Sequence, residues 1–272
     1  MSKRIQSARY ERKFVVSEAL AREIREYARG LLELDEHGIG HPDGAYPVHS
    51  IYLDSDAMKT YWDTLNGVKD RFKLRARYYS GDADAPVYLE VKRRANRRIV
   101  KQRAAVRREA AVGILDGQDA EPEALVSSDR QALVAFEDFN RLVRELRARP
   151  KVHVAYLREA YMPASDDNST RLTLDRLVCC AREETGRIST VLGDALPVWR
   201  GAVVLELKFT DVLADWCINL IRTFDLRQCG AAKYFQSVSL MGGRMSQHQR
   251  LPIPNRDCQW PGGQEDSVSR RG

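Results

Sequence analysis

The sequence predicts an α+β fold in which about eight antiparallel strands close into a β-barrel tunnel with flanking helices. Three observations predict it. Many short segments alternate charged and apolar residues as strands do, amphipathic helical patterns lie between them, and cations repeat on one side of the strands. The tunnel is therefore expected to have a polar, cationic lumen. The chain of 272 residues is long enough for one large domain with a substantial core.

The first expected elements are a strand at residues 10–16 and a helix that begins after Ser17. The segment YERKFVV alternates in polarity, and Ser17 is a suitable N-cap. The apolar positions of the helix are Leu20, Ile24, Tyr27 and Leu31. A second strand is expected at residues 48–54, after the loop HGIGHPDGAYP. For the aromatic pair Tyr61 and Trp62 that follows, packing at the barrel rim is favoured over stacking against an adenine, which stays open as an alternative.

A β-meander is expected next, because three alternating segments are joined by short turn sequences. Its strands are predicted at 71–79, 87–94 and 98–106. The Gly-, Asp- and Glu-rich residues 113–127 are predicted to form a linker. A long helix is expected at residues 128–149, closed by Pro150.

Three strands and a final helix complete the predicted domain. They are expected at 152–162, 171–181, 202–210 and, for the helix, 210–226. The sequence thus predicts one domain over residues 1–253. The remaining residues 254–272 are rich in Gly, Arg, Asp and Ser, which is typical of a disordered tail.

Charged side chains share one face in most of these strands. In RFKLRARYY, alternate positions carry Arg71, Lys73, Arg75 and Arg77. For a single strand, the simplest explanation is a sheet face exposed to water. That explanation is weaker for VVLELKFT, since Glu206 and Lys208 are the only charges in an otherwise apolar run. A buried carboxylate and ammonium must be paired or must hold a ligand.

Curling of these strands would bring a large excess of cations into one lumen. The cations are Lys13, Lys73, Arg75, Arg77, Lys92, Lys101, Arg103, Arg158, Arg171, Lys208 and Lys233. The acids on the same faces are Glu11, Glu90, Asp175 and Glu206. Such an excess requires a polyanion, and phosphate fits best because arginine binds its oxygens bidentately and lysine adds point charge. The few carboxylates are then candidate ligands of Mg²⁺ or Mn²⁺, which take carboxylate and phosphate oxygens together.

Composition disfavours several other classes of function. The net charge of +6 fits an anionic partner, but no platform of stacking aromatic residues accompanies the cations, so nucleic-acid binding is not expected. The five cysteines and five histidines lack zinc-ligand spacing, and the cysteines are expected to be reduced. No apolar run reaches the ~20 residues of a membrane helix, which predicts a cytoplasmic protein without a span of its own.

Short motifs stand in order along the chain: YERKF, SIYLD, KLRARYY, YLEVKRR followed by KQR, YLREAY, RLTLDR, VLELKF and AAKYFQS. Together they resemble the VTC domain of the vacuolar transporter chaperone polyphosphate polymerases and its bacterial relatives. The resemblance covers about residues 10–240 and is that of a soluble, bacterial-type member. The VTC domain belongs to the triphosphate tunnel metalloenzymes.

The resemblance implies that a triphosphate or polyphosphate binds in the tunnel with Mn²⁺ or Mg²⁺. The phosphate-binding residues it implies are Lys13, Lys73, Arg75, Lys92, Arg158, Arg171 and Lys233, and the metal ligand is Glu206. Position in the lumen adds Arg77, Lys101, Arg103 and Lys208 to the phosphate-binding set. Glu11 and Glu90 are further candidate metal ligands. The residues expected to act in catalysis are Lys73, Arg75, Arg158 and Glu206.

This chain departs from the pattern of the family and its superfamily at two positions. The ExExK signature of the superfamily begins with a glutamate where this chain has Arg9, so a two-metal hydrolytic arrangement is not expected. In the late motif Ala232 stands where a hydroxyl residue would precede Lys233 and Tyr234, so one hydroxyl that could contact phosphate is missing.

The expected function is metal-dependent transfer of the γ-phosphate of ATP to a growing chain of inorganic polyphosphate. No nucleophile from the protein is needed, because phosphoryl transfer depends mainly on positioning and electrostatic stabilisation. Two alternatives stay open: a tripolyphosphatase or nucleoside triphosphatase, and a sensor that binds polyphosphate without catalysis. The expected partners are ATP or triphosphate and polyphosphate. Threading of a product through a membrane would need a membrane-protein partner.

Overall fold

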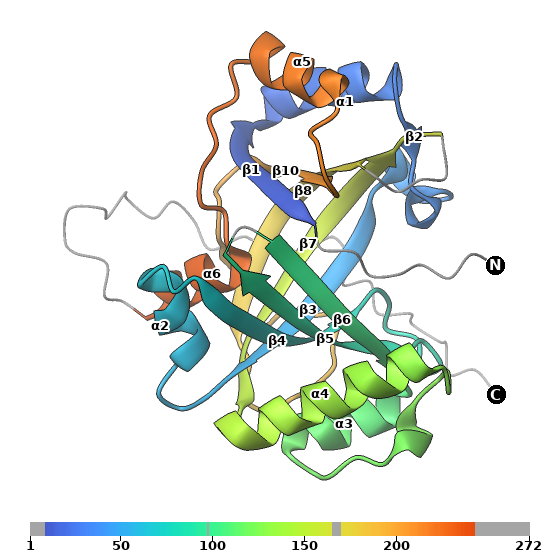
Figure 1. Ribbon diagram of the computed structural model, residues 1–272, viewed down its shortest axis with the longest axis vertical. Helices are drawn as coiled ribbons and strands as arrows, with labels where there is room; N and C mark the ends of the chain where they lie inside the picture. Colours follow the sequence, from blue (N-terminus) through green and yellow to red (C-terminus); the bar gives the residue numbers. More distant parts are fainter. Residues whose placement is uncertain (1–8, 97, 165–169, 243–272) are drawn as a thin grey trace, which may run out of the picture.

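The computed structural model describes residues 9–96, 98–164 and 170–242, which form one antiparallel sheet and its covering helices (Figure 1). The strands are β1 (Tyr10–Ser17), β2 (Glu33–Leu34), β3 (Tyr46–Asp54), β4 (Asp70–Tyr78), β5 (Val87–Ala95), β6 (Arg98–Val106), β7 (Arg149–Met162), β8 (Thr170–Arg182), β9 (Leu196–Pro197) and β10 (Ala202–Phe209). The helices are α1 (Glu18–Arg29), α2 (Lys59–Leu65), α3 (Arg108–Asp116), α4 (Arg130–Leu146), α5 (Asp215–Thr223) and α6 (Lys233–Met241). Short 3-10 turns lie at η1 (Glu36–Gly38), η2 (Pro42–Gly44) and η3 (Pro122–Ala124). The α+β class is therefore confirmed.

The predicted closed barrel of about eight strands is wrong. The sheet has ten strands, paired in the order β1-β10-β8-β7-β3-β4-β5-β6, with β2 and β9 paired beside this path. Among the described residues, its edge strands β1 and β6 share no backbone ladder: Arg9, just before β1, forms one isolated bridge with Ile99 of β6. Near that bridge the carboxylate of Glu11 in β1 accepts a hydrogen bond of 2.8 Å from the ammonium group of Lys92 in β5. The sheet is curled on itself but stays open.

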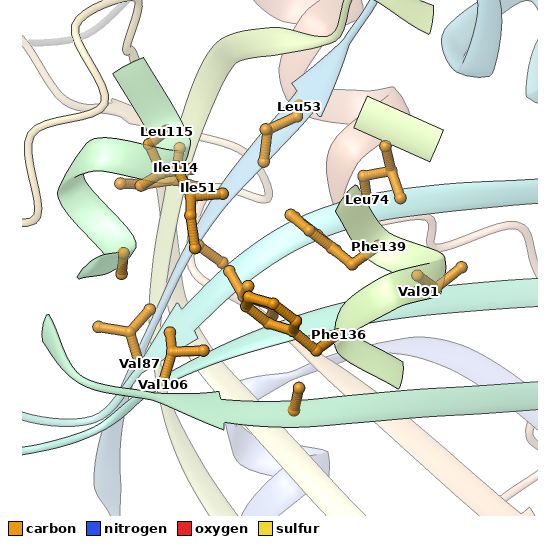
Figure 2. Close-up of a cluster of buried hydrophobic side chains, with 14 of the residues drawn as sticks. Ile51, Leu53, Leu74, Val87, Val91, Val106, Ile114, Leu115, Phe136 and Phe139 are labelled. Atoms are coloured by element: carbon orange, nitrogen blue, oxygen red, sulfur yellow. The ribbon is translucent and has the colours of Figure 1, made fainter. Parts of the chain in front are cut away.

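One half of the outer face of the sheet packs against α3 and α4. Leu74, Leu89 and Val91 project from the meander onto Phe136 and Phe139 of α4, and all of these side chains are buried. Figure 2 shows this cluster, with Ile114 and Leu115 of α3 at its side. The alternation that the sequence shows in β4 and β5 thus sends the apolar positions outward to the helices, and the charged positions to the opposite side.

The other half of the outer face packs against α1 and α5, at the top of Figure 1. Phe14 of β1 and Leu205 and Leu207 of β10 pack with Ile24 of α1 and Leu220 of α5. Burial of these aliphatic and aromatic side chains, each stabilising by roughly 1.5–3 kcal/mol, holds the curled sheet between two helical layers. We call the side of the sheet opposite these helices the inner face.

Helix α6 closes part of the inner face. Ala231 and Tyr234 pack there against Tyr156 of β7 and against Val178 and Cys180 of β8. β8 reaches this contact through a bulge, where Leu177 has a φ of 49° and the pairing with β7 shifts by one residue. The shift lets both Val178 and, further along the strand, Asp175 face inward.

The local predictions were confirmed at most positions. Ser17 caps α1, since its hydroxyl accepts a hydrogen bond of 3.2 Å from the amide of Leu20. The linker predicted at 113–127 is wrong in its first part, because α3 extends to Asp116 and buries Ile114 and Leu115 in the core. The predicted tail at 254–272 lies outside the described residues. No helix within the described ranges is long and apolar enough to cross a membrane.

Candidate functional site

The strand register places the predicted cations on the inner face. Because directly paired residues of an antiparallel sheet point to the same side, the meander carries them in tiers. The first tier is Lys73, Lys92 and Lys101; the second is Arg75, Glu90 and Arg103; the third begins with Arg77 and Tyr88. This wall of the site follows directly from the alternation in the sequence.

The facing wall is built by β1, β10, β8 and β7. In the strand register, Lys208 of β10 lies between Glu11 of β1 and Arg171 of β8. Glu206 of β10 lies in the same way between Lys13 and Thr173. Asp175 of β8 is paired with Arg158 of β7. Lys233 enters from the first turn of α6 and is buried. Four strands and one helix thus bring together cations that the sequence separates by more than two hundred residues.

Glu206 is the centre of this wall. Its Oε1 accepts hydrogen bonds from Lys13, at 2.8 Å, and from Lys233, at 3.2 Å. Its Oε2 lies 3.1 Å from the ammonium group of Lys208 and 3.9 Å from Arg158. Burial by itself would raise the pKa of Glu206, but the ammonium groups of Lys13 and Lys233 hold that pKa well below its usual range. Glu206 is therefore an anion surrounded by cations.

Asp175 and Arg158 form a second ion pair beside Glu206. Two parallel hydrogen bonds of 2.7 Å join the guanidinium group of Arg158 to the two carboxylate oxygens of Asp175. Lys233 adds a contact of 2.6 Å to the same carboxylate. Burial alone would raise the pKa of Asp175, but Arg158 and Lys233 lower it to about 2. Asp175 is one of the carboxylates that the sequence offers as a metal ligand, but its contacts are those of a charge partner of Arg158 and Lys233.

On the meander wall, Glu90 is fully buried and contacts three cations. Arg75 donates a hydrogen bond of 2.7 Å to Glu90, Lys101 another of 3.2 Å, and Arg103 lies 3.6 Å away. Burial opposes ionisation, yet Arg75 and Lys101 hold the pKa of Glu90 well below its usual range. Glu90 therefore fixes the orientation of these cations, in keeping with a role in shaping a binding surface.

Four lysines of the inner face, Lys73, Lys92, Lys101 and Lys208, have pKa values below their usual range, mainly because they are buried. Burial, with the repulsion of Lys13 and Lys92, lowers the pKa of Lys73 to about 7. Burial likewise lowers the pKa of Lys208 to about 7 and that of Lys101 to about 8, although carboxylates lie nearby. These ammonium groups are held in a partly dehydrated space with more positive than negative charge, which an anionic ligand would relieve.

The two walls are also joined across the interior. Lys92 of β5 binds both carboxylate oxygens of Glu11 of β1, at 2.8 and 2.9 Å. From β4, Arg77 donates hydrogen bonds to Ser50 and, across β3, to the hydroxyl of Tyr156, at 2.9 Å. The contacts of Lys92 with Glu11 and of Arg77 with Tyr156 join strands that are not neighbours and hold the charged faces toward one another.

The carboxylates fit a metal ion only as partners of phosphate. Within the described part of the chain, no three His, Cys, Asp or Glu side chains lie together as a preformed metal site. The ammonium group of Lys13 lies 3.8 Å from the carboxylate of Glu11 and 2.8 Å from that of Glu206, so these two carboxylates contact the same cation. Glu90 is paired with Lys101 on the other wall. One or two carboxylates completed by phosphate oxygens are a common donor set for Mg²⁺. Glu206 with Glu11 fits this set, and Glu90 does not join it.

Two buried polar clusters lie outside the site that the sequence predicts. Asp54 accepts hydrogen bonds from the amides of Thr60 and Tyr61 and, at 2.6 Å, from the hydroxyl of Tyr234, which ties α2 to α6. On the outer face, His49 and His153 lie 3.1 Å apart in a hydrogen bond between Nδ1 and Nε2. A buried aspartate before a helix is a signal that could have found the first cluster. The histidines are more than a hundred residues apart and give no local signal.

One protein family model matches nearly the whole of the described chain. The family model of the VTC domain matches residues 8–242. Among solved structures, a protein of Bacillus halodurans described as a "putative adenylate cyclase" matches with 13% sequence identity and a TM-score of 0.48, over 83% of this chain and 94% of that chain. A search of curated proteins found no match. The family match includes every strand of the inner face and α6.

Proposed function

Because this chain belongs to the VTC domain family, we propose that it is a polyphosphate polymerase, which transfers the γ-phosphate of ATP to a growing polyphosphate chain. The triphosphate of ATP and the end of the acceptor chain would both lie on the inner face. The expected acceptor is the terminal phosphate oxygen of the chain, which forms the new P–O bond as the bond to ADP breaks.

One observation carries this proposal: the inner face holds a buried excess of positive charge after all its carboxylates are paired. Glu206, Asp175 and Glu90 each contact more than one cation, and Lys73 forms no salt bridge with any described residue. Such an excess costs stability in the free protein and is compensated when a polyanion binds. A chain of phosphates, with about one charge on each unit, fits both walls at once.

The proposed roles follow from the two walls. Lys73 and Arg75 would bind phosphate oxygens from the meander, and Arg158 would bind them from β7. The further phosphate-binding residues of the proposal are Lys13, Arg77, Lys92, Lys101, Arg103, Arg171, Lys208 and Lys233. Apart from Lys73, these groups are already held by ion pairs or hydrogen bonds, so they can stabilise charge on the transferring phosphate with little reorganisation.

Glu206 is the proposed ligand of Mn²⁺ or Mg²⁺, with Glu11 as the nearest further carboxylate. When bound, such a cation would neutralise charge on the phosphate oxygens. In the free protein Lys13 and Lys233 contact the same oxygen of Glu206. Phosphate that draws these ammonium groups away would leave the carboxylate of Glu206 available to the cation.

The test is a product analysis with a matched variant. Purified protein is incubated with ATP and Mn²⁺, and in parallel with Mg²⁺, and the products are resolved on a polyphosphate gel beside a free-phosphate assay. Glu206→Gln serves as the variant that keeps the size of the side chain but cannot supply an anionic ligand. A ladder of chains that is absent in Glu206→Gln would support the polymerase.

The other outcomes assign the alternatives. Free phosphate without chains would make the protein a tripolyphosphatase or nucleoside triphosphatase. Tight binding of triphosphate without either product would leave a sensor. A ladder of equal yield in Glu206→Gln would refute the role of Glu206 in binding the metal.

A further inference from the structure

One cluster of apolar and aromatic side chains extends along the inner face from Tyr52 to Tyr46, and Tyr79 packs against it. Toward Tyr52 of β3, Val152 and Val154 of β7 pack in this cluster with α6. At the other end of the same strand stands Tyr46, which pairs with Arg158. Rings from three further segments gather there. We call His37, Tyr46, Tyr79 and Tyr88 the aromatic mouth.

The rings of the aromatic mouth contact one another in a chain. The rings of His37 and Tyr79 are stacked, with centroids 5.9 Å apart and planes 15° apart. Tyr46 lies 5.7 Å from His37 and 6.1 Å from Tyr79, and Tyr88 meets Tyr79 edge-on at 5.8 Å. His37 is exposed and Tyr79 and Tyr88 are half-buried. Aromatic surface therefore stays accessible beside the charged side chains of the inner face.

The aromatic mouth is joined directly to the proposed phosphate-binding cations. The guanidinium group of Arg103 lies 3.5 Å from the centroid of the Tyr88 ring and donates a hydrogen bond of 3.4 Å to the hydroxyl of Tyr79. Arg171 donates one of 3.3 Å to the hydroxyl of Tyr46. The aromatic mouth therefore directly adjoins cations of both walls of the inner face.

A short loop fixes His37 in this position. One carboxylate oxygen of Asp35 accepts a hydrogen bond of 2.7 Å from the amide of His37, and the other forms an ion pair with Arg171. Asp35 is buried. The same carboxylate therefore links the loop that carries an exposed ring to a cation of the inner face.

We propose that the aromatic mouth binds the base of the nucleoside triphosphate by stacking on His37 and Tyr79. In such a substrate the ribose separates the base from the first phosphate, so a triphosphate held by the cations places its base beyond one end of their row, and the aromatic mouth stands at the end marked by Arg77 and Tyr88. Stacking of a base on aromatic side chains is sequence-tolerant and contributes substantially to affinity. This inference rests on the proposed function and names nucleotide, in preference to free tripolyphosphate, as the phosphate donor.

The aromatic pair on α2 is the natural comparison. Tyr61 is stacked on Phe235 of α6, with centroids 5.2 Å apart, and its hydroxyl contacts Ser239 at 3.2 Å. Trp62 is 44% exposed and meets Tyr61 edge-on. This pair contacts α6 and none of the proposed phosphate-binding cations, so packing explains Tyr61, and Trp62 provides an exposed aromatic control.

The experiment compares two ligands that share the phosphates and differ in the nucleoside. Binding of the non-hydrolysable ATP analogue adenylyl imidodiphosphate and of tripolyphosphate is measured by titration calorimetry, without turnover. The variants are His37→Ala and Tyr79→Ala, with Tyr79→Phe as the variant that keeps the ring and Trp62→Ala as the control. Circular dichroism confirms that each variant is folded.

We expect His37→Ala and Tyr79→Ala to lower the affinity for the ATP analogue by about five- to fiftyfold. The affinity for tripolyphosphate should change by less than about twofold. Trp62→Ala should bind both ligands as the wild type does, and Tyr79→Phe, which keeps the ring, should bind the analogue more tightly than Tyr79→Ala. Equal losses for both ligands, or no loss for the analogue, would overturn the base site. If the wild type binds neither ligand, the proposed function itself fails. If it binds tripolyphosphate alone, only the nucleotide preference fails.

Discussion

The ammonium group of Lys73 lies 5.3 Å from the centroid of the Tyr234 ring, where it forms no salt bridge with a described residue. Burial and the cations Lys13 and Lys92 lower its pKa to about 7. Lys73 therefore changes charge near neutral pH, which no other feature of its strand would suggest. A cation that is half-neutral in the free protein and fully charged beside phosphate must take up a proton on binding.

The first prediction concerns this proton uptake. Above pH 7 the free protein loses the charge of Lys73, so the affinity for tripolyphosphate should fall between pH 7.5 and 9. Lys208 and Lys101, with pKa values lowered to about 7 and about 8, should add to the slope. Calorimetry at pH 8 in two buffers of different ionisation enthalpy measures the protons taken up. Lys73→Arg should take up fewer, because arginine stays charged. Equal uptake by both proteins would contradict the assignment to Lys73.

The second prediction separates binding from stability at Arg75. Arg75→Ala removes a hydrogen bond of 2.7 Å from Glu90, which is fully buried, and should lower the free energy of unfolding by about 1–3 kcal/mol. It should also weaken tripolyphosphate binding. Adding Glu90→Gln removes the poorly compensated charge and should restore part of the stability without restoring the affinity. Urea denaturation measures the free energy of unfolding, and calorimetry on the same samples measures the affinity for tripolyphosphate. Recovery of both the stability and the affinity in the double variant would show that Arg75 acts only through Glu90.

The third prediction concerns the link between α2 and α6. Tyr234→Phe removes one hydrogen bond of 2.6 Å to Asp54 and should lower the free energy of unfolding by about 1 kcal/mol. Asp54→Ala also leaves the amides of Thr60 and Tyr61 without their acceptor and should cost about 3 kcal/mol or more. Because both changes remove the same bond, the double variant should lose less than the sum of the two. Strict additivity in urea denaturation would argue against the coupling.

The fourth prediction concerns acid stability. Burial lowers the pKa of His49 to about 4 and that of His153 to about 3, below the ordinary value of 6.5. The unfolded chain binds protons below pH 6.5 and the folded chain does not, so stability that is present above pH 6.5 is lost as the pH falls. Each histidine should contribute a loss of about 2 kcal/mol between pH 6.5 and 5.

The matched variant for this prediction is His153→Gln, which keeps a hydrogen-bonding side chain but does not titrate. It should reduce the dependence of stability on pH between 5 and 7. The carboxylates of the inner face titrate below this range, because the pKa values of Glu90 and Glu206 are held well below the usual range. An unchanged pH dependence in urea denaturation would show that the histidine pair is not responsible.

The sequence by itself determined which face each strand residue takes. Alternation is local, so Lys73, Arg75 and Arg77 could be assigned to the face opposite Leu74 and Ala76 without any knowledge of strand order. The motifs that carry this alternation also identified the family, whose model matches residues 8–242. The candidate site could be predicted to this extent because its residues lie at regular positions in long strands.

Only the tertiary structure decided which side chains meet. The pairing of Glu11 with Lys92, the open edge between β1 and β6, and the contact of His49 with His153 depend on strand order and curl. Two-residue strands such as β2 and β9 are too short to leave a periodic pattern, so the strand count was wrong. Periodicity fixes the direction of a side chain from its neighbours in the chain, whereas contacts over more than a hundred residues depend on how the whole sheet bends.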